Sequence, residues 1–469
     1  MWWQFRQDFI SLITRTHDKN NYFYPVDGLR AIANLLIILC HLVTIFNTFI
    51  PSYPNDEWKE YLESIAFKLS PLMAYGLEIF FMLSGFLLTY KLISQWKKNN
   101  MNVRLFIKFY PIFIFKRALR FWPGMLLSTL VMLILGEPKY PNSTYSFESF
   151  RYLSVWLFFQ NYIDIEYWLA SLAPLWSISL DMQVHIILTL LLYLFYRYRK
   201  SISIYYSLGI LFLLSIILSI IIFNPITMPI IEVTRQYHNL PLLLPKHYFI
   251  WLETTYNITF PFQISKINPM KIFLHNMYLP FEARFGSFIT GALLAIKLIE
   301  NPSLQPNQND KYKKYFILVL IFLYILSPIV IDIDRFASSQ FNLILTLSIA
   351  CSRQIFALSQ AFILFTALCP STHPYHSPWI KHFLSLSIWI PISKLSYLVY
   401  LIHWRISFEL IFHGPLNFLQ TYPITYAIII SLPIVLFLSQ IISCLWYVII
   451  EKPFNRFLDN HKSYKSHPI

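Results

Sequence analysis

The segment at residues 29–49 reads LRAIANLLIILCHLVTIFNTF, and Arg30 is its only Lys, Arg, Asp or Glu. A helix of about 20 apolar residues spans the roughly 30 Å hydrocarbon core of a bilayer. Similar apolar runs recur almost to the end of the 469-residue chain, which is 56% hydrophobic and only 13% charged. That balance leaves too little polar surface for a water-soluble protein of this size. The sequence therefore predicts an all-α integral membrane protein.

We expect a bundle of about ten transmembrane helices. The apolar runs that predict them cover residues 29–49, 72–92, 113–135, 175–196, 204–223, 281–298, 315–333, 343–368, 392–412 and 424–450. The ninth run is more polar than the others, because it follows Pro391 and contains Lys394, His403 and Arg405. No soluble domain interrupts the series, so the functional groups must lie inside the bundle or in its loops.

The formal net charge of +14 comes mainly from Lys and Arg residues in short segments between the apolar runs. Basic loops usually remain in the cytoplasm. The basic segments at 91–116, 197–200 and 297–314 fall on one side of the predicted bundle, together with the tail after Glu451. We therefore expect both termini to be cytoplasmic. The positive charge then serves topology and contact with membrane lipids, and we expect no nucleic-acid partner.

The predicted organisation has three parts. Residues 1–20 form a cytoplasmic segment, in which Trp2 and Trp3 favour a short interfacial helix. Residues 21–455 form the transmembrane domain, and residues 456–469 form a cytoplasmic tail. The cysteines are Cys40, Cys351, Cys369 and Cys444. Their spacing fits neither a disulfide framework nor a metal site, so we expect buried packing residues and no metal.

His41 is the first candidate for chemistry. It follows Arg30 by eleven positions, a rise of about 16 Å along a helix. Arg30 then lies at the predicted cytoplasmic edge, and His41 lies near the middle of the membrane. An ionisable group at that depth is costly unless it pairs or lines a watery cavity. A neutral imidazole there can take a proton from an attacking hydroxyl, and the alternative is a structural histidine bonded to a neighbouring helix.

Arg117 and Arg120 form a second candidate site at the start of the third apolar run. They are three residues apart and therefore lie on one face of a helix. Two guanidinium groups in this arrangement suit phosphate oxygens, such as those of acyl-coenzyme A. The alternative is a basic cluster that only fixes topology or binds anionic lipids.

Other polar residues inside the apolar runs are candidates for an acceptor pocket or its support. Asp181 and His185 are one helical turn apart and can bond to each other. Such a pair would line the acceptor cavity or orient His41, and the alternative is a self-satisfied structural pair. Gly85 allows a close approach by another helix or a ligand. Arg284 begins its run, so snorkelling or capping is a structural alternative for it. The full set of candidates is Ser84, Trp176, Asp181, His185, Arg284 and His403.

Taken in order, several motifs resemble those of the membrane proteins of acyltransferase family 3. They are Asp27–Ala33 followed by His41, the Phe80–Phe86 element, Arg117 with Arg120, the Arg284–Ala292 stretch, the Ser396–His403 segment and the closing Glu451–Phe454 element. Each motif alone is weak, but the ordered set runs from about Asp27 to Pro453 and is specific.

The resemblance implies an O-acyltransferase, and an O-acetyltransferase in the commonest case. The enzyme would move an acyl group from cytoplasmic acetyl-CoA or another acyl-CoA to a hydroxyl of a cell-envelope glycan or glycolipid. It also implies roles for residues of this chain. His41 would be the general base, Arg30 would position His41 or the donor, and Arg117 with Arg120 would hold coenzyme A.

Some features differ from the pattern of the family. Many bacterial members have Glu where this chain has Asp181, and an aromatic residue where it has His185. The chain lacks the large amino-terminal extracytoplasmic domain of the animal branch, so we expect a multi-pass protein of a bacterial inner membrane. It also lacks a carboxy-terminal hydrolase-like domain, so we expect the membrane domain to complete the transfer. A transporter or flippase for a glycolipid or small molecule is the alternative, because buried Arg and His residues also form substrate paths.

Overall fold

The computed structural model describes residues 2–14, 23–49, 75–135, 148–162, 170–199, 203–222, 281–300 and 343–460. Every regular element within these ranges is helical. The elements are α1 (Trp2–Ile13), α2 (Tyr24–Phe49), α5 (Gly76–Asn99), α6 (Val103–Leu135), α7 (Glu148–Trp156), η1 (Gln160–Tyr162), η3 (Ala170–Leu175), α8 (Trp176–Arg197), α9 (Ile204–Ile222), α13 (Phe281–Glu300), α16 (Leu343–Leu368), α17 (Pro378–Leu384), α18 (Trp389–Phe412), η6 (Asn417–Thr421), α19 (Ile424–Trp446), η7 (Tyr447–Glu451) and α20 (Lys452–Asn460).

Six helical segments of the described ranges are long and apolar enough to cross a membrane. They are Tyr24–Phe46, Gly76–Asn99, Val103–Leu135, Leu172–Arg197, Trp389–Phe412 and Ile424–Leu458. The protein is therefore a multi-pass integral membrane protein, and its described residues form helices wherever they are regular. The predicted span at 315–333 lies outside the described residues, and each of the other predicted spans coincides with a helix. The total of ten crossings and the cytoplasmic side of the termini remain predictions.

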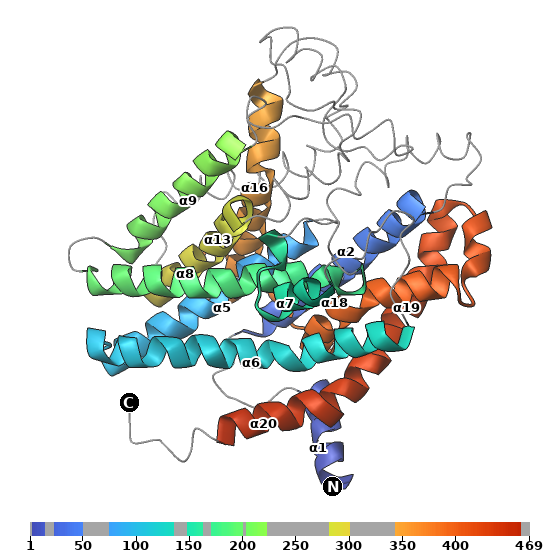
Figure 1. Ribbon diagram of the computed structural model, residues 1–469. Coiled ribbons are helices and arrows are strands. Elements are labelled where there is room, and N and C mark those ends of the chain that lie inside the picture. Colours follow the sequence, from blue (N-terminus) through green and yellow to red (C-terminus); the bar gives the residue numbers. More distant parts are fainter. Residues whose placement is uncertain are drawn as a thin grey trace.

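The helices pack around a central group formed by α2, α5, α8 and α18. In Figure 1, α8 lies beside α5 and α6, while α18 lies beside α2, α6 and α19. The starts of α2 and α18 meet, because the Ser393 hydroxyl donates a hydrogen bond to Asp27 Oδ1 at 2.9 Å. α13 packs against α5 and also contacts α9 and α16. Four helices therefore converge on one interior region from distant parts of the sequence.

Glycine permits the closest helix contact near this region. A side chain at Gly85 of α5 would overlap the backbone of Phe288 in α13, and one at Gly291 of α13 would overlap the backbone of Met82 in α5. The two helices therefore touch backbone to backbone, as small residues allow in membrane bundles. The close approach predicted at Gly85 is confirmed, and its partner is a helix.

The turn after α5 brings α6 back alongside the same interior region. Asn100 ends α5 in the left-handed conformation, with φ of 46°, and its backbone N–H donates to Trp96 O. Asn tolerates this conformation better than most residues. α6 begins three residues later, at Val103. The basic segment between the two predicted spans is therefore largely helical.

The two ends of the described chain meet at the same end of the bundle. Asp8 of α1 forms an ion pair with Arg456 of α20. The Lys394 ammonium of α18 donates to the backbone oxygen of Ser11 at 2.5 Å and of Thr14 at 2.9 Å. α1 is thus fastened to the start of α18 and to α20, and Figure 1 shows α1 and α20 next to each other.

Candidate functional site

A cavity of about 850 Å³ lies among α2, α5, α6, α8 and α18. Pockets of about 300–1,000 Å³ are typical of small-molecule and cofactor sites. Its two ends differ in chemistry. One end is lined by Lys and Arg residues near the α5–α6 turn and the starts of α2 and α18, and the other end by apolar and hydroxyl side chains.

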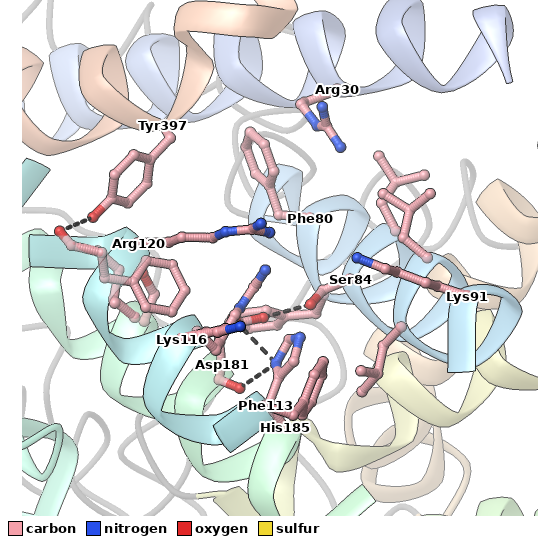
Figure 2. A pocket seen from close by; sticks show the side chains of 18 of the residues that line it. Arg30, Phe80, Ser84, Lys91, Phe113, Lys116, Arg120, Asp181, His185 and Tyr397 are labelled. Atoms are coloured by element: carbon pink, nitrogen blue, oxygen red, sulfur yellow. Dashed lines mark hydrogen bonds and ion pairs between the residues drawn. The ribbon is translucent and has the colours of Figure 1, made fainter. Parts of the chain in front are cut away.

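The first end of the cavity is strongly cationic. Its basic lining residues are Arg30, Lys91, Lys108, Lys116, Arg117, Arg120 and Lys394. Asp181 is the only carboxylate among the lining residues that the structure describes. In Figure 2, Arg30, Lys91 and Arg120 extend from three different helices toward the same open space. Such a concentration of positive charge attracts a polyanionic ligand and raises its local concentration.

Asp181 of α8 joins three helices at the wall of this cavity. Its Oδ1 accepts a hydrogen bond from the Ser84 hydroxyl of α5 at 2.5 Å. Its Oδ2 lies 2.8 Å from Arg117 Nη2 of α6 and 3.3 Å from His185 Nδ1. His185 Nδ1 is also 2.8 Å from the Asp181 backbone oxygen, so the predicted contact between these two residues is present. The Ser84, Arg117 and His185 side chains thus converge on the Asp181 carboxylate.

The opposite end of the cavity is apolar, apart from a pair of hydroxyl groups. Phe80 and Ile178 line it together with Ser177 and Tyr400. The Ser177 hydroxyl lies 2.8 Å from the Tyr400 hydroxyl, and Tyr400 donates to Pro174 O at 3.0 Å. These hydroxyls are therefore satisfied within the protein. An apolar wall of this kind suits the less polar part of a ligand whose charged part lies among the cations.

His41 and His403 form a hydrogen-bonded pair. His41 Nδ1 of α2 lies 2.6 Å from His403 Nε2 of α18, with the ring planes only 5° apart. His403 Nδ1 contacts the backbone oxygens of Tyr400 at 2.8 Å and Val399 at 3.1 Å. Carbonyl oxygens only accept hydrogen bonds, so His403 Nδ1 carries a proton, and Nε2 of the neutral ring is an acceptor. His41 Nδ1 is then the donor, and His41 Nε2 keeps its lone pair.

The histidine pair lies just beyond the apolar end of the cavity, and neither histidine lines it. Tyr400, which does line it, precedes His403 by one helical turn on α18. His403 is 0% exposed, whereas His41 is only partly buried and has the edge of the Trp404 ring against it. His41 is therefore the more accessible member of the pair, and His403 can act only through His41.

The surroundings of Arg284 differ from those of a residue that snorkels or caps a helix, the structural alternative considered for it from the sequence. It is 1% exposed and forms an ion pair with Glu78, which is 0% exposed. The Ser287 hydroxyl also donates to Glu78 at 2.5 Å, and Trp176 lies 5.7 Å from the Arg284 guanidinium carbon. Arg284 therefore does not snorkel or cap a helix end. Glu78 was not among the predicted site residues, although a carboxylate inside an apolar run is a usable signal.

Trp176 and Arg284 therefore belong to a buried network between α5, α8 and α13. Neither lines the cavity, and Trp176 contacts Arg284 through its ring face. The structure thus divides the predicted residues into three places. Arg30, Ser84, Arg117, Arg120, Asp181 and His185 line the cavity, His41 and His403 form the pair beyond it, and Trp176 and Arg284 lie in the network.

Comparison with known proteins identifies the family of this chain. A family model described as an acyltransferase domain, that of acyltransferase family 3, matches residues 23–445. The chain belongs to acyltransferase family 3. The resemblance carried by the ordered motifs is thereby confirmed, and this protein is a membrane acyltransferase. The closing Glu451–Phe454 element lies beyond the matched residues.

A partial relative of this acyltransferase is known from Listeria monocytogenes. The chain is 29% identical to the peptidoglycan O-acetyltransferase OatA of that organism over 194 residues. The matched part covers 40% of this chain and 26% of OatA. No solved structure matches the acyltransferase.

Proposed function

We propose that this acyltransferase is an O-acetyltransferase that takes the acetyl group from acetyl-CoA and delivers it to a hydroxyl of a cell-envelope glycan or glycolipid. The cationic cavity beside the histidine pair is the observation that carries the proposal. Coenzyme A has a polyanionic nucleotide end and a less polar thioester end, and the two ends of the cavity differ in the same sense. Another short acyl-CoA would satisfy the same chemistry.

Separate observations support the proposed side of the membrane and the proposed acceptor. The cationic end of the cavity lies near α1 and the start of α18. Lys394 of α18 lines the cavity and also contacts the end of α1. Positive charge favours the cytoplasmic face, where acyl-CoA is available. The name of the Listeria relative, a peptidoglycan O-acetyltransferase, supports a glycan acceptor. A bacterial inner membrane is the compartment in which these two substrates meet.

In the proposed reaction, His41 Nε2 removes the proton of the acceptor hydroxyl as its oxygen bonds to the thioester carbonyl carbon. The carbon–sulfur bond then breaks, and the coenzyme A thiolate takes the proton from His41. His403 holds the His41 ring and its tautomer through the 2.6 Å contact between Nδ1 and Nε2. His403 is fully buried and His41 is partly buried, which limits the access of bulk water that would hydrolyse the thioester.

Arg120→Gln tests the donor site. Purified full-length protein in lipid nanodiscs is given labelled acetyl-CoA and envelope glycan, and the label in the glycan is measured. We expect wild type to transfer label, and Arg120→Gln to raise the KM for acetyl-CoA about tenfold, because a charge-assisted phosphate contact is lost. Lys98→Gln is the matched control, since Lys98 is exposed near the end of α5 and does not line the cavity.

Two results would count against the proposal. If wild type transfers no acetyl group to any envelope glycan or glycolipid fraction, the O-acetyltransferase function is wrong. If wild type transfers it but the KM is the same in Arg120→Gln and Lys98→Gln, the cationic cavity is not the donor site.

His403→Leu tests the positioning role of the second histidine. Loss of the acceptor for His41 Nδ1–H frees the ring to rotate and to change tautomer, so we expect kcat to fall about 100-fold. The KM for acetyl-CoA should change little. His403→Gln keeps an acceptor oxygen and should recover most of the activity. Equal losses of kcat in the Leu and Gln variants would show that His403 only fills space.

A further inference from the structure

Asn34 of α2 is a buried amide that the mechanism has not used. It is 0% exposed, and neither its side-chain oxygen nor its side-chain nitrogen has a hydrogen-bond partner within the described residues. A buried amide without hydrogen-bond partners destabilises the folded protein, because its polar groups lose their contacts with water. Native proteins keep few such groups, and those that persist often mark the place of a ligand or a catalytic group.

The position of Asn34 links the cavity with the histidine pair. Asn34 follows Arg30 by four residues and precedes His41 by seven, so all three lie on one face of α2. That face is turned toward α18 at both ends. Asp27 accepts a hydrogen bond from Ser393 at the start of α2, and His41 contacts His403 further along it.

The part of α18 between these two contacts borders the cavity. Ser396 and Tyr400 lie there, and both line the cavity wall. Asn34 therefore lies between the apolar end of the cavity and His41, at the interface of α2 and α18. A ligand whose charged end remains among Arg30 and the other cations has to pass this level to reach His41.

In the proposed donor, the segment that would lie beside Asn34 is the pantetheine arm. In acyl-CoA, the pantetheine arm joins the nucleotide phosphates to the thioester, and it contains two secondary amides. Each of these amides offers one N–H donor and one carbonyl acceptor, which complements the NH₂ donors and the oxygen acceptor of an Asn side chain. The other side chains of α2 between Arg30 and His41 are Ala, Ile, Leu and Cys, which offer no such pair.

We infer that Asn34 hydrogen-bonds an amide of the pantetheine arm as the arm passes between α2 and α18 to present the thioester to His41. The inference rests on the proposed function, because it assumes acyl-CoA as the donor. Since Asn34 is fully buried, side chains at the α2–α18 interface must part to admit the arm. Asn34 is then a residue that selects coenzyme A thioesters over donors without amides.

Asn34→Leu separates this role from a structural one, because the two roles predict opposite changes in stability. Binding of coenzyme A and of adenosine 3′,5′-bisphosphate, which lacks the pantetheine arm, is measured by calorimetry on full-length protein in detergent. We expect about tenfold weaker binding of coenzyme A, unchanged binding of the bisphosphate, and a higher thermal unfolding midpoint.

Thr89→Val is the matched control for this experiment. Thr89 of α5 is also 0% exposed, with a hydroxyl that lacks a partner within the described residues, and it lies one turn beyond Gly85, which contacts α13. Its replacement removes an unsatisfied polar group away from the cavity lining. We therefore expect a higher unfolding midpoint and unchanged binding of both probes.

Other results of these binding and unfolding measurements would overturn either the inference about Asn34 or the proposed donor. Unchanged coenzyme A binding in Asn34→Leu, or an equal loss for both probes, overturns the inference. A lower unfolding midpoint or failure to fold also overturns it, because Asn34 would then have a structural partner. If wild type binds neither probe, the proposed donor itself is wrong, and this result is distinguishable from all the others.

Discussion

His41→Ala is expected to lower the turnover of acyl transfer by about 10²- to 10⁴-fold, which is the usual contribution of a general base. The substitution removes the nitrogen that takes the acceptor proton and leaves His403 Nε2 without its donor. The cationic lining is untouched, because His41 does not line the cavity. Binding of acyl-CoA should therefore remain close to that of wild type, and the loss should lie in kcat.

The measurement is single-turnover transfer of acetyl label at matched amounts of protein in the membrane. His413→Ala is the matched control, since the side chain of His413 is 66% exposed and its Nδ1 lies 3.2 Å from Glu409 Oε2. It should leave turnover unchanged. Normal transfer by His41→Ala would leave the family assignment standing and would remove His41 as the base.

Glu78→Gln is expected to destabilise the protein by about 3–5 kcal/mol, the usual cost of removing one partner from a buried ion pair. Glu78 is 0% exposed and pairs with Arg284, while Arg353 Nε lies 3.8 Å from its Oε1. The neutral amide leaves two guanidinium groups facing each other without a carboxylate between them. Because these residues join α5, α13 and α16, the packing of these three helices should loosen first.

Thermal unfolding in one detergent, compared across variants, measures this effect. Asp8→Asn removes the carboxylate from the pair with Arg456, whose side chain is 35% exposed, and should cost no more than about 1 kcal/mol. Glu78→Leu combined with Arg284→Met removes charge from both partners and should be more stable than Glu78→Gln alone. If Glu78→Gln unfolds at the temperature of wild type, the buried network does not hold the three helices together.

Much of the fold could be predicted from local sequence, because a spanning helix is recorded in about 20 consecutive apolar residues. The helices α2, α5, α6 and α8 follow from such runs. Contacts within one helix could be predicted too. Asp181 and His185 are one turn apart and do touch, and Arg117 and Arg120 do line the same cavity.

Contacts between helices could not be predicted in the same way. His41 and His403 are separated by 362 positions, and hydropathy does not say which faces of two spans meet. The same limit applies to Glu78 and Arg284, which are distant in sequence yet paired in the bundle. Arg284 begins its run and therefore resembles a snorkelling residue. Only the close packing of α5 against α13 at Gly85 and Gly291 brings it to a carboxylate.

The side chain of Lys394 connects the cavity with the end of α1. This side chain lines the cavity, and its ammonium donates hydrogen bonds to the backbone oxygens of Ser11 and Thr14 at the end of α1. The beginning of the chain is thus mechanically tied to a wall of that cavity. A deletion of residues 1–14 would remove both acceptors of the Lys394 ammonium without altering any lining residue. Residues outside the cavity therefore help to hold one of its lining side chains in place.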